Sequence, residues 1–147
     1  MLAGEVKDFG LVSTAFGLGG LIGAIFTYLI AAKFKEKSPN IFGLILSAIV
    51  ISVSLNHSLN ILVGLMVCAG ILLTMTNNIA NSNLQLMATN KVRGKYASLF
   101  QLAFRGGLSL GALTTGLMTS QWGIVTAFLI NGTMATIAHL ALLKFRE

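Results

Sequence analysis

The stretch "LVSTAFGLGGLIGAIFTYLIAA" (11–32) decides the fold, because no charged residue interrupts it. An α-helix that crosses the hydrocarbon core of a bilayer needs about 20 consecutive, mostly apolar residues. The run meets this length. It is too long for the apolar region of a secretory signal peptide, and acidic residues precede it. The run therefore predicts a membrane-spanning helix near the start of the chain.

The rest of the chain has the same character. Of its 147 residues, 55% are hydrophobic and only 10% are charged, whereas about a quarter of the residues in a soluble domain are charged. The apolar runs predict five transmembrane helices, at about 11–32, 41–55, 59–80, 96–120 and 124–143. The third run turns polar, and we expect its helix to continue to about residue 88. The expected fold is all-α, a polytopic membrane helix bundle in a single transmembrane domain (1–147).

The connectors between these runs alternate in charge. Basic clusters follow the first and third runs and end the chain: Lys33, Lys35 and Lys37; Lys91, Arg93 and Lys95; Lys144 and Arg146. The other two connectors, "NHSLN" (56–60) and "TSQWG" (119–123), contain no lysine or arginine. Because cytoplasmic loops concentrate Lys and Arg, we expect the N-terminus outside and the C-terminus in the cytoplasm.

The composition also excludes several classes of protein. The ten Lys and Arg residues against four Asp and Glu lie in short clusters between apolar runs, whereas nucleic-acid binding needs a basic face on a soluble module. Cys68 is the single cysteine, so no cysteine metal site is expected. The sequence contains no nucleophile with a neighbouring base, no metal-ligand cluster and no phosphate-binding loop. We therefore expect neither an enzyme nor a bound cofactor.

Two runs carry glycines four residues apart, which align on one face of a helix. They are Gly19 and Gly23 in the first run, and Gly107 and Gly111 in the fourth. Such a face lets a neighbouring backbone approach closely, so these glycines are predicted helix-packing residues. Their surroundings, "GGLIGA" (19–24) and "GGLSLGA" (106–112), share a pattern, as equivalent helices of an inverted repeat would. Whether the glycines only pack or also let helices slide stays open.

The polar half of the third run has a one-sided pattern. At about 100° per residue, one stripe roughly 140° wide collects its polar residues: Thr74, Asn77, Asn78, Asn81, Ser82 and Gln85. Hydrocarbon cannot satisfy amides, so the stripe must face other helices or a water-filled path. Hydrogen bonds that hold the bundle together are one interpretation. We favour a path-lining role for Asn77, Asn78, Asn81 and Gln85, because the stripe has more polar groups than packing needs.

Arg105 lies inside the fourth run, in "QLAFRGGLSLGALTTG" (101–116). It is about nine residues past the basic end, hence roughly 14 Å deep in a hydrocarbon core about 30 Å thick. An unpaired charge there costs at least about 2.5 to 3.5 kcal/mol. All four carboxylates lie in connectors or termini: Glu5, Asp8, Glu36 and Glu147. The partner of Arg105 must be an amide of the third run, an anionic substrate or a carboxylate outside this sequence. We favour a substrate-path role for Arg105, and a structural buried pair is the alternative.

The stretch "NSNLQLMATNKVRGKYASLFQLAFRGGLSLGALTTG" (81–116) resembles the region joining the tenth and eleventh helices of major facilitator superfamily transporters. The likeness is greatest to bacterial multidrug or siderophore exporters of the enterobactin-exporter type. The matching residues are Asn81, Leu84, Gln85, Arg93-Gly94-Lys95, Ser98-Leu99, Phe104, Gly106-Gly107 and Leu110-Gly111-Ala112. The stretch "FGLVSTAFGLGGLIGA" (9–24) is similar to the eighth helix, and the resemblance covers nearly the whole chain.

The resemblance implies a partial major facilitator C-terminal domain, helices eight to twelve of twelve, whose partners are the lipid bilayer, absent N-terminal helices and a small-molecule substrate. It implies a proton-coupled exporter of the bacterial inner membrane that works by alternating access. Lys33, Lys91, Arg93 and Lys95 would lie in cytoplasmic loops. In "IAAKFKEK" (30–37), Ala32 and Lys35 replace the aspartate and glycine of the family pattern. A non-transporting membrane subunit or remnant that only associates with other helices is the alternative.

Overall fold

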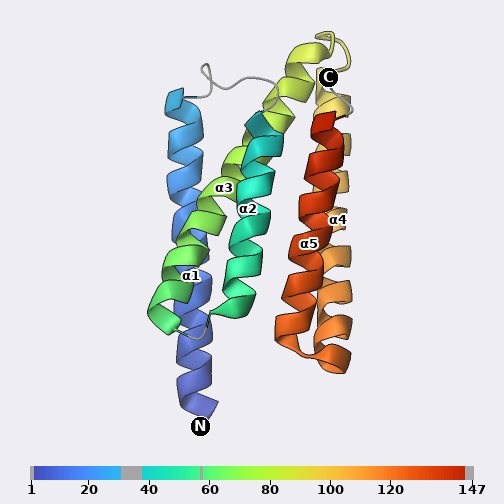
Figure 1. Ribbon diagram of the computed structural model, residues 1–147. Coiled ribbons are helices and arrows are strands. Elements are labelled where there is room, and N and C mark those ends of the chain that lie inside the picture. The colour runs from blue at the N-terminus through green and yellow to red at the C-terminus, as the bar shows by residue number, and fades with distance from the viewer. Residues whose placement is uncertain (1, 31–37, 57, 145–147) are drawn as a thin grey trace.

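The computed structural model describes residues 2–30, 38–56 and 58–144, and every regular element in this part of the chain is an α-helix. The helices are α1 (Leu2–Ile30), α2 (Ser38–Leu55), α3 (Leu59–Met87), α4 (Arg93–Trp122) and α5 (Ile124–Lys144). They lie lengthwise beside one another as a bundle (Figure 1). The predicted all-α bundle of five helices is confirmed.

Each helix coincides with one of the apolar runs within the described residues, since a backbone within hydrocarbon must satisfy its own hydrogen bonds. α1 begins before its run and includes the charged residues Lys7 and Asp8. α3 continues without a break through its polar half to Met87. The polar stripe of α3 therefore belongs to the same rigid element as its apolar half.

Three helical segments are long and apolar enough to cross a membrane: Val6–Leu29, Leu59–Met87 and Ile124–Lys144. Pro39–Leu55 in α2 is apolar but shorter. α4 has 30 residues, but its glycines, hydroxyl side chains and Arg105 lower its hydropathy. Among the five helices, α4 is therefore the least suited to contact lipid on all sides.

Successive helices run in opposite directions, so the connectors alternate between the two ends of the bundle (Figure 1). The α3–α4 connector lies at the same end as the last turn of α5. This end, called the basic end below, carries Lys91, Arg93, Lys95 and Lys144. The start of α1 and the α2–α3 and α4–α5 connectors lie at the opposite end.

A single residue, Gly123, joins α4 to α5. Its φ of 83° lies in a region that favours glycine. Its N–H donates to the carbonyl oxygen of Thr119 at 3.0 Å, and its carbonyl oxygen accepts from the N–H of Ala127 at 3.1 Å. The two helices therefore form a tight hairpin.

The helices pack in pairs through small residues. α1 packs against α3, α2 against α5 and α3, and α4 against α5 and, less closely, α3. α4 contains no buried residue. Large apolar side chains remain exposed, among them Leu21 (65%) and Leu102 (71%). Exposure on this scale is unusual for a soluble protein and suits helices whose outer faces meet lipid or further helices.

Candidate functional site

The polar stripe of α3 lies in the half of the helix nearer the basic end (Figure 1). Asn77, Asn78, Asn81 and Gln85 are all partly buried. The Nε2 of Gln85 donates to Oδ1 of Asn81 at 3.2 Å. The Oδ1 of Asn77 is buried and has no hydrogen-bond partner among the described residues. Leaving such a group unpaired costs about 1 to 3 kcal/mol. The stripe therefore offers more polar atoms than the described helices satisfy.

An open hollow of about 240 Å³ lies on this stripe. Its lining is Asn78, Asn81, Ser82, Gln85, Leu86 and Arg93, of which only Leu86 is apolar. Three of the four amide residues singled out from the sequence thus contribute to one polar surface. Asn77, the fourth, is not among the lining residues.

Arg93 connects the first turn of α4 to the end of the stripe. Its Nε donates to the carbonyl oxygen of Gln85 at 3.0 Å. That carbonyl lies in the last turn of α3, where unpaired carbonyls give the helix end a partial negative charge and a cation is favourable. The sequence indicated Arg93 only as a loop residue. A basic residue a few positions after a helix end was the signal for this cap.

Gly19 and Gly23 lie where the backbones of α1 and α3 come together. A Cβ atom added to Gly19 would overlap the carbonyl group of Val67. At Gly23 the added atom would lie 2.6 Å from the carbonyl oxygen of Ile71. Real Cβ atoms do not approach backbone this closely, so the contact requires glycine at both positions.

The same contact reaches the start of the polar stripe. A Cβ atom added to Gly70 of α3 would overlap the carbonyl oxygen of Phe16, and one added to Gly20 would lie 3.2 Å from Oγ1 of Thr74. Thr74 is the first residue of the stripe. The stripe therefore begins on the side of α3 that α1 covers and continues along that side toward the basic end.

Gly107 and Gly111 have a different environment. A Cβ atom added to either glycine would meet nothing within 4 Å. Both line a lateral groove of about 590 Å³ along α4. Within the described residues, this face of α4 has no helix packed closely on it.

Arg105 is exposed, and its guanidinium makes no hydrogen bond or ion pair within the part of the chain that the structure describes. Its carbonyl oxygen accepts from Oγ of Ser109 at 3.0 Å, which is an ordinary bond within the helix. Gln101, Arg105 and Ser109 are four residues apart and share one side of α4. No hydrogen bond joins this side to the α3 stripe. The two polar features lie on different helices and remain separate in this structure.

A further amide, Asn131 of α5, was not singled out from the sequence. Its Nδ2 donates to Oγ1 of Thr115 in α4 at 2.7 Å. Thr115 and Asn131 line both the 590 Å³ groove and a second groove of about 720 Å³ between α2, α4 and α5. The signal in the sequence was a single amide side chain in a helix of mostly apolar residues.

The contact between α2 and α5 was likewise not predicted from the sequence. Oγ1 of Thr136 lies 2.8 Å from Oγ of Ser47 and 2.8 Å from the carbonyl oxygen of Gly132. A Cβ atom added to Gly43 would overlap the imidazole of His139. Small residues four apart, as in Gly43 and Ser47, were the available signal. This contact holds α5 against α2.

Among the basic loop residues, Lys91 and Lys95 are exposed, and neither makes a side-chain hydrogen bond or ion pair with a described residue. Lys33 lies outside the described residues. Within the described ranges, no three His, Cys, Asp or Glu side chains gather where they could hold a metal ion.

The comparisons with known proteins identify the family. A family model described as Major Facilitator Superfamily matches residues 2–147. No curated protein and no solved structure matches the chain. The match includes all five helices, together with the polar stripe and Arg105. This chain of membrane-spanning helices therefore belongs to the Major Facilitator Superfamily, a family of membrane transporters.

Proposed function

We propose that this chain supplies helices eight to twelve of a twelve-helix secondary transporter that exports small molecules across the bacterial inner membrane. Two helical bundles would rock around a central site and expose it alternately to each side. In this arrangement the basic end of the bundle faces the cytoplasm. Asp8 is the one carboxylate in the described spans, and it lies in the first turns of Val6–Leu29. A residue that carries a coupling proton near the middle of the membrane would therefore belong to the other bundle.

The observation that carries this proposal is the polar stripe of α3. Leu59–Met87 has a mean hydropathy of 2.2, high enough for a membrane span, yet one side of it keeps partly buried amides around an open hollow. Lipid would leave these amides unsatisfied. A stripe that serves only to hold helices together would have its amides paired with other helices. Here, the hydrogen bond between amide side chains of the stripe joins two of its own members, Gln85 and Asn81, and does not reach another helix.

Arg105 supports the same proposal from α4. A charge within a membrane span faces a bundle interior or a water-filled cavity in nearly all known cases. Arg105 is exposed on a helix without buried residues, so the cavity it faces lies outside the described helices. An anionic substrate or a carboxylate of the other bundle would pair with it there.

The test is the change Arg105→Leu in the complete transporter. We expect transport of its substrate into inverted membrane vesicles to fall at least about tenfold, because the leucine cannot pair with an anion. Arg105→Lys keeps the charge and should retain part of the activity. The amount of protein in the membrane should not fall in either variant, because leucine in place of a charge within the span favours insertion and lysine keeps the charge.

Unchanged transport by the Arg105→Leu variant would assign this residue to a structural role and remove the support that α4 gives to the proposal.

The alternative function, a non-transporting subunit, has a separate test. The gene with its flanking DNA would be expressed and its product reconstituted in vesicles. Failure of that product to move any substrate would overturn the transporter proposal for this chain.

A further inference from the structure

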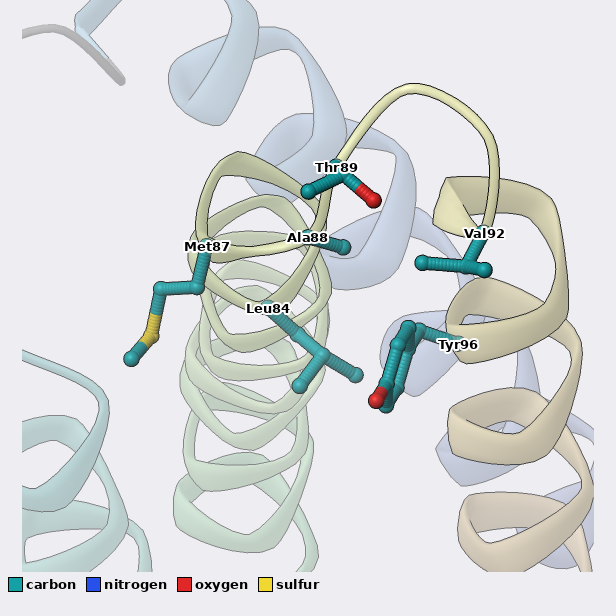
Figure 2. A pocket seen from close by; sticks show the side chains of 6 residues that line it. All are labelled: Leu84, Met87, Ala88, Thr89, Val92 and Tyr96. Atoms are coloured by element: carbon teal, nitrogen blue, oxygen red, sulfur yellow. The ribbon is translucent and has the colours of Figure 1, made fainter.

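A second hollow lies at the basic end, between the end of α3 and the start of α4 (Figure 2). Its volume is about 380 Å³, and its lining is Leu84, Met87, Ala88, Thr89, Val92 and Tyr96. Leu84 and Ala88 on one side face Val92 and Tyr96 on the other (Figure 2). The lining is mainly apolar, in contrast to the hollow on the polar stripe.

The connector that forms this hollow is well ordered by hydrogen bonds. The N–H groups of Val92 and Arg93 both donate to the carbonyl oxygen of Thr89, at 3.0 and 3.1 Å. The Nε of Arg93 donates to the carbonyl oxygen of Gln85 in the last turn of α3, at 3.0 Å. These hydrogen bonds fix the shape of the hollow at the α3–α4 junction. The Nε of Arg93 takes part in them.

Two lysines with no hydrogen-bond or ion-pair partner among the described residues are close in sequence to the residues that line the hollow. Lys91 directly precedes Val92, the N-cap residue of α4, and Lys95 lies three residues after it in the first turn of α4. This spacing places Lys95 close to Val92. Both lysines are exposed. The only acidic residues in the described ranges, Glu5 and Asp8, lie in the first turns of α1 at the opposite end. Within the described residues, no acidic side chain at this end offsets the positive charge of Lys91 and Lys95.

An apolar path continues from the hollow along α4. Val92, Tyr96, Leu99, Ala103 and Leu110 follow one another at three-, four- and seven-residue spacings and so lie along one side of the helix. Leu99 is 52% and Leu110 is 65% exposed. Tyr96 lies at the junction of the charged rim and this path, and tyrosine is favoured at the level of the lipid headgroups.

From these features we infer that the α3–α4 junction is a binding site for one anionic phospholipid. The phosphate lies between Lys91 and Lys95, the glycerol region and first acyl carbons fill the hollow, and the rest of one acyl chain lies along α4. A soluble anion would use the lysines but not the apolar hollow. A neutral phospholipid would use the hollow but gain nothing from the lysines.

The experiment measures lipid binding to the purified 147-residue chain in an uncharged detergent by native mass spectrometry. Dioleoyl phosphatidylglycerol and dioleoyl phosphatidylcholine are compared, because they differ in charge and share acyl chains. We expect the anionic lipid to bind at least about tenfold more tightly, since each lysine near a membrane surface strengthens such binding about fivefold and the two together about 30-fold. The double change Lys91→Gln and Lys95→Gln should abolish this preference.

A matched control removes the same number of lysines elsewhere. Lys7→Gln with Lys144→Gln changes the net charge equally, and both residues are exposed on other helices. This variant should keep the preference. Ala88→Phe, which fills the hollow, should weaken binding of both lipids several-fold while circular dichroism shows unchanged helix content.

Three results would each overturn the inference. The first is equal binding of the two lipids by the unaltered chain. The second is the same loss of preference in the control variant, which would show a response to net charge alone. The third is displacement of the anionic lipid by millimolar glycerol 3-phosphate, which would show an anion site that does not use the hollow.

Discussion

At the scale of the residue, glycines with the same spacing have two different environments. Gly19 and Gly23 meet the carbonyl groups of α3, whereas Gly107 and Gly111 face open space. Glycine lowers helix stability by about 1 kcal/mol relative to alanine. In α1 this cost is offset by a backbone contact that no larger residue permits. In α4 no described contact offsets it.

This difference predicts opposite effects of one added methyl group. Gly19→Ala should lower the free energy of unfolding of the purified chain by about 1 to 3 kcal/mol, because the new Cβ overlaps Val67. Gly111→Ala should leave it unchanged or raise it by up to about 1 kcal/mol. Unfolding in sodium dodecyl sulfate, followed by circular dichroism, measures both. Equal destabilisation by the two changes would contradict the close α1–α3 contact.

At the scale of the element, α2 and α5 are joined through hydroxyl groups. Ser47 is 2% exposed, and its Oγ donates to the carbonyl oxygen of Leu44 at 2.8 Å while Thr136 approaches it from α5. Serine and threonine within a helix commonly bond to their own backbone. The pair Ser47 and Thr136 adds a bond between helices, so it sets the register of α5 on α2.

A double-mutant cycle tests this register contact. Ser47→Ala and Thr136→Val should show a coupling free energy of about 0.6 kcal/mol, the average for hydrogen bonds between membrane helices. The matched control is Ser52→Ala with Thr136→Val, because the Ser52 hydroxyl bonds only to Ala48 of its own helix. Coupling as large in the control would show that the cycle reports a general change of α2.

The positions of the helices could be predicted from the sequence, but which helices pack against each other could not. Uncharged runs such as 11–32 require helix because hydrocarbon leaves no other way to satisfy the backbone. The one-sided amides of α3 were recognisable because helical spacing alone places them on one stripe. Pairing depends on side-chain and backbone fit at particular depths. Spacing therefore marks a packing face such as Gly43 and Ser47 but does not name its partner. The cap by Arg93, the bond from Asn131 to Thr115 and the contact of His139 with Gly43 each depend on such a partner.

At the scale of the whole molecule, charge is distributed unevenly between the two ends. Lys91, Arg93, Lys95 and Lys144 lie at the basic end, while the α2–α3 and α4–α5 connectors carry no lysine or arginine. Such asymmetry orients a protein during insertion, because basic loops stay in the cytoplasm. The structure adds that connectors distant in sequence share one end (Figure 1).

The orientation can be measured by labelling single cysteines in a Cys68→Ala background. Cysteines in place of Asn60 and Ser120, at the end without basic connectors, should react with an impermeant maleimide in intact cells. A cysteine in place of Lys95 should react only after permeabilisation, as should one in place of Glu36, which lies outside the described residues. The reverse pattern would invert the proposed topology.

The one-residue connection at Gly123 also has a consequence for how the protein is made. Because α4 and α5 leave no slack between them, the two helices must enter the membrane together as a hairpin. α4 alone is a poor candidate for release from the translocon, since Arg105 costs about 2.5 to 3.5 kcal/mol near its centre. α5 is apolar enough to partition by itself. α5, which is synthesised after α4, therefore draws its less apolar predecessor into the bilayer.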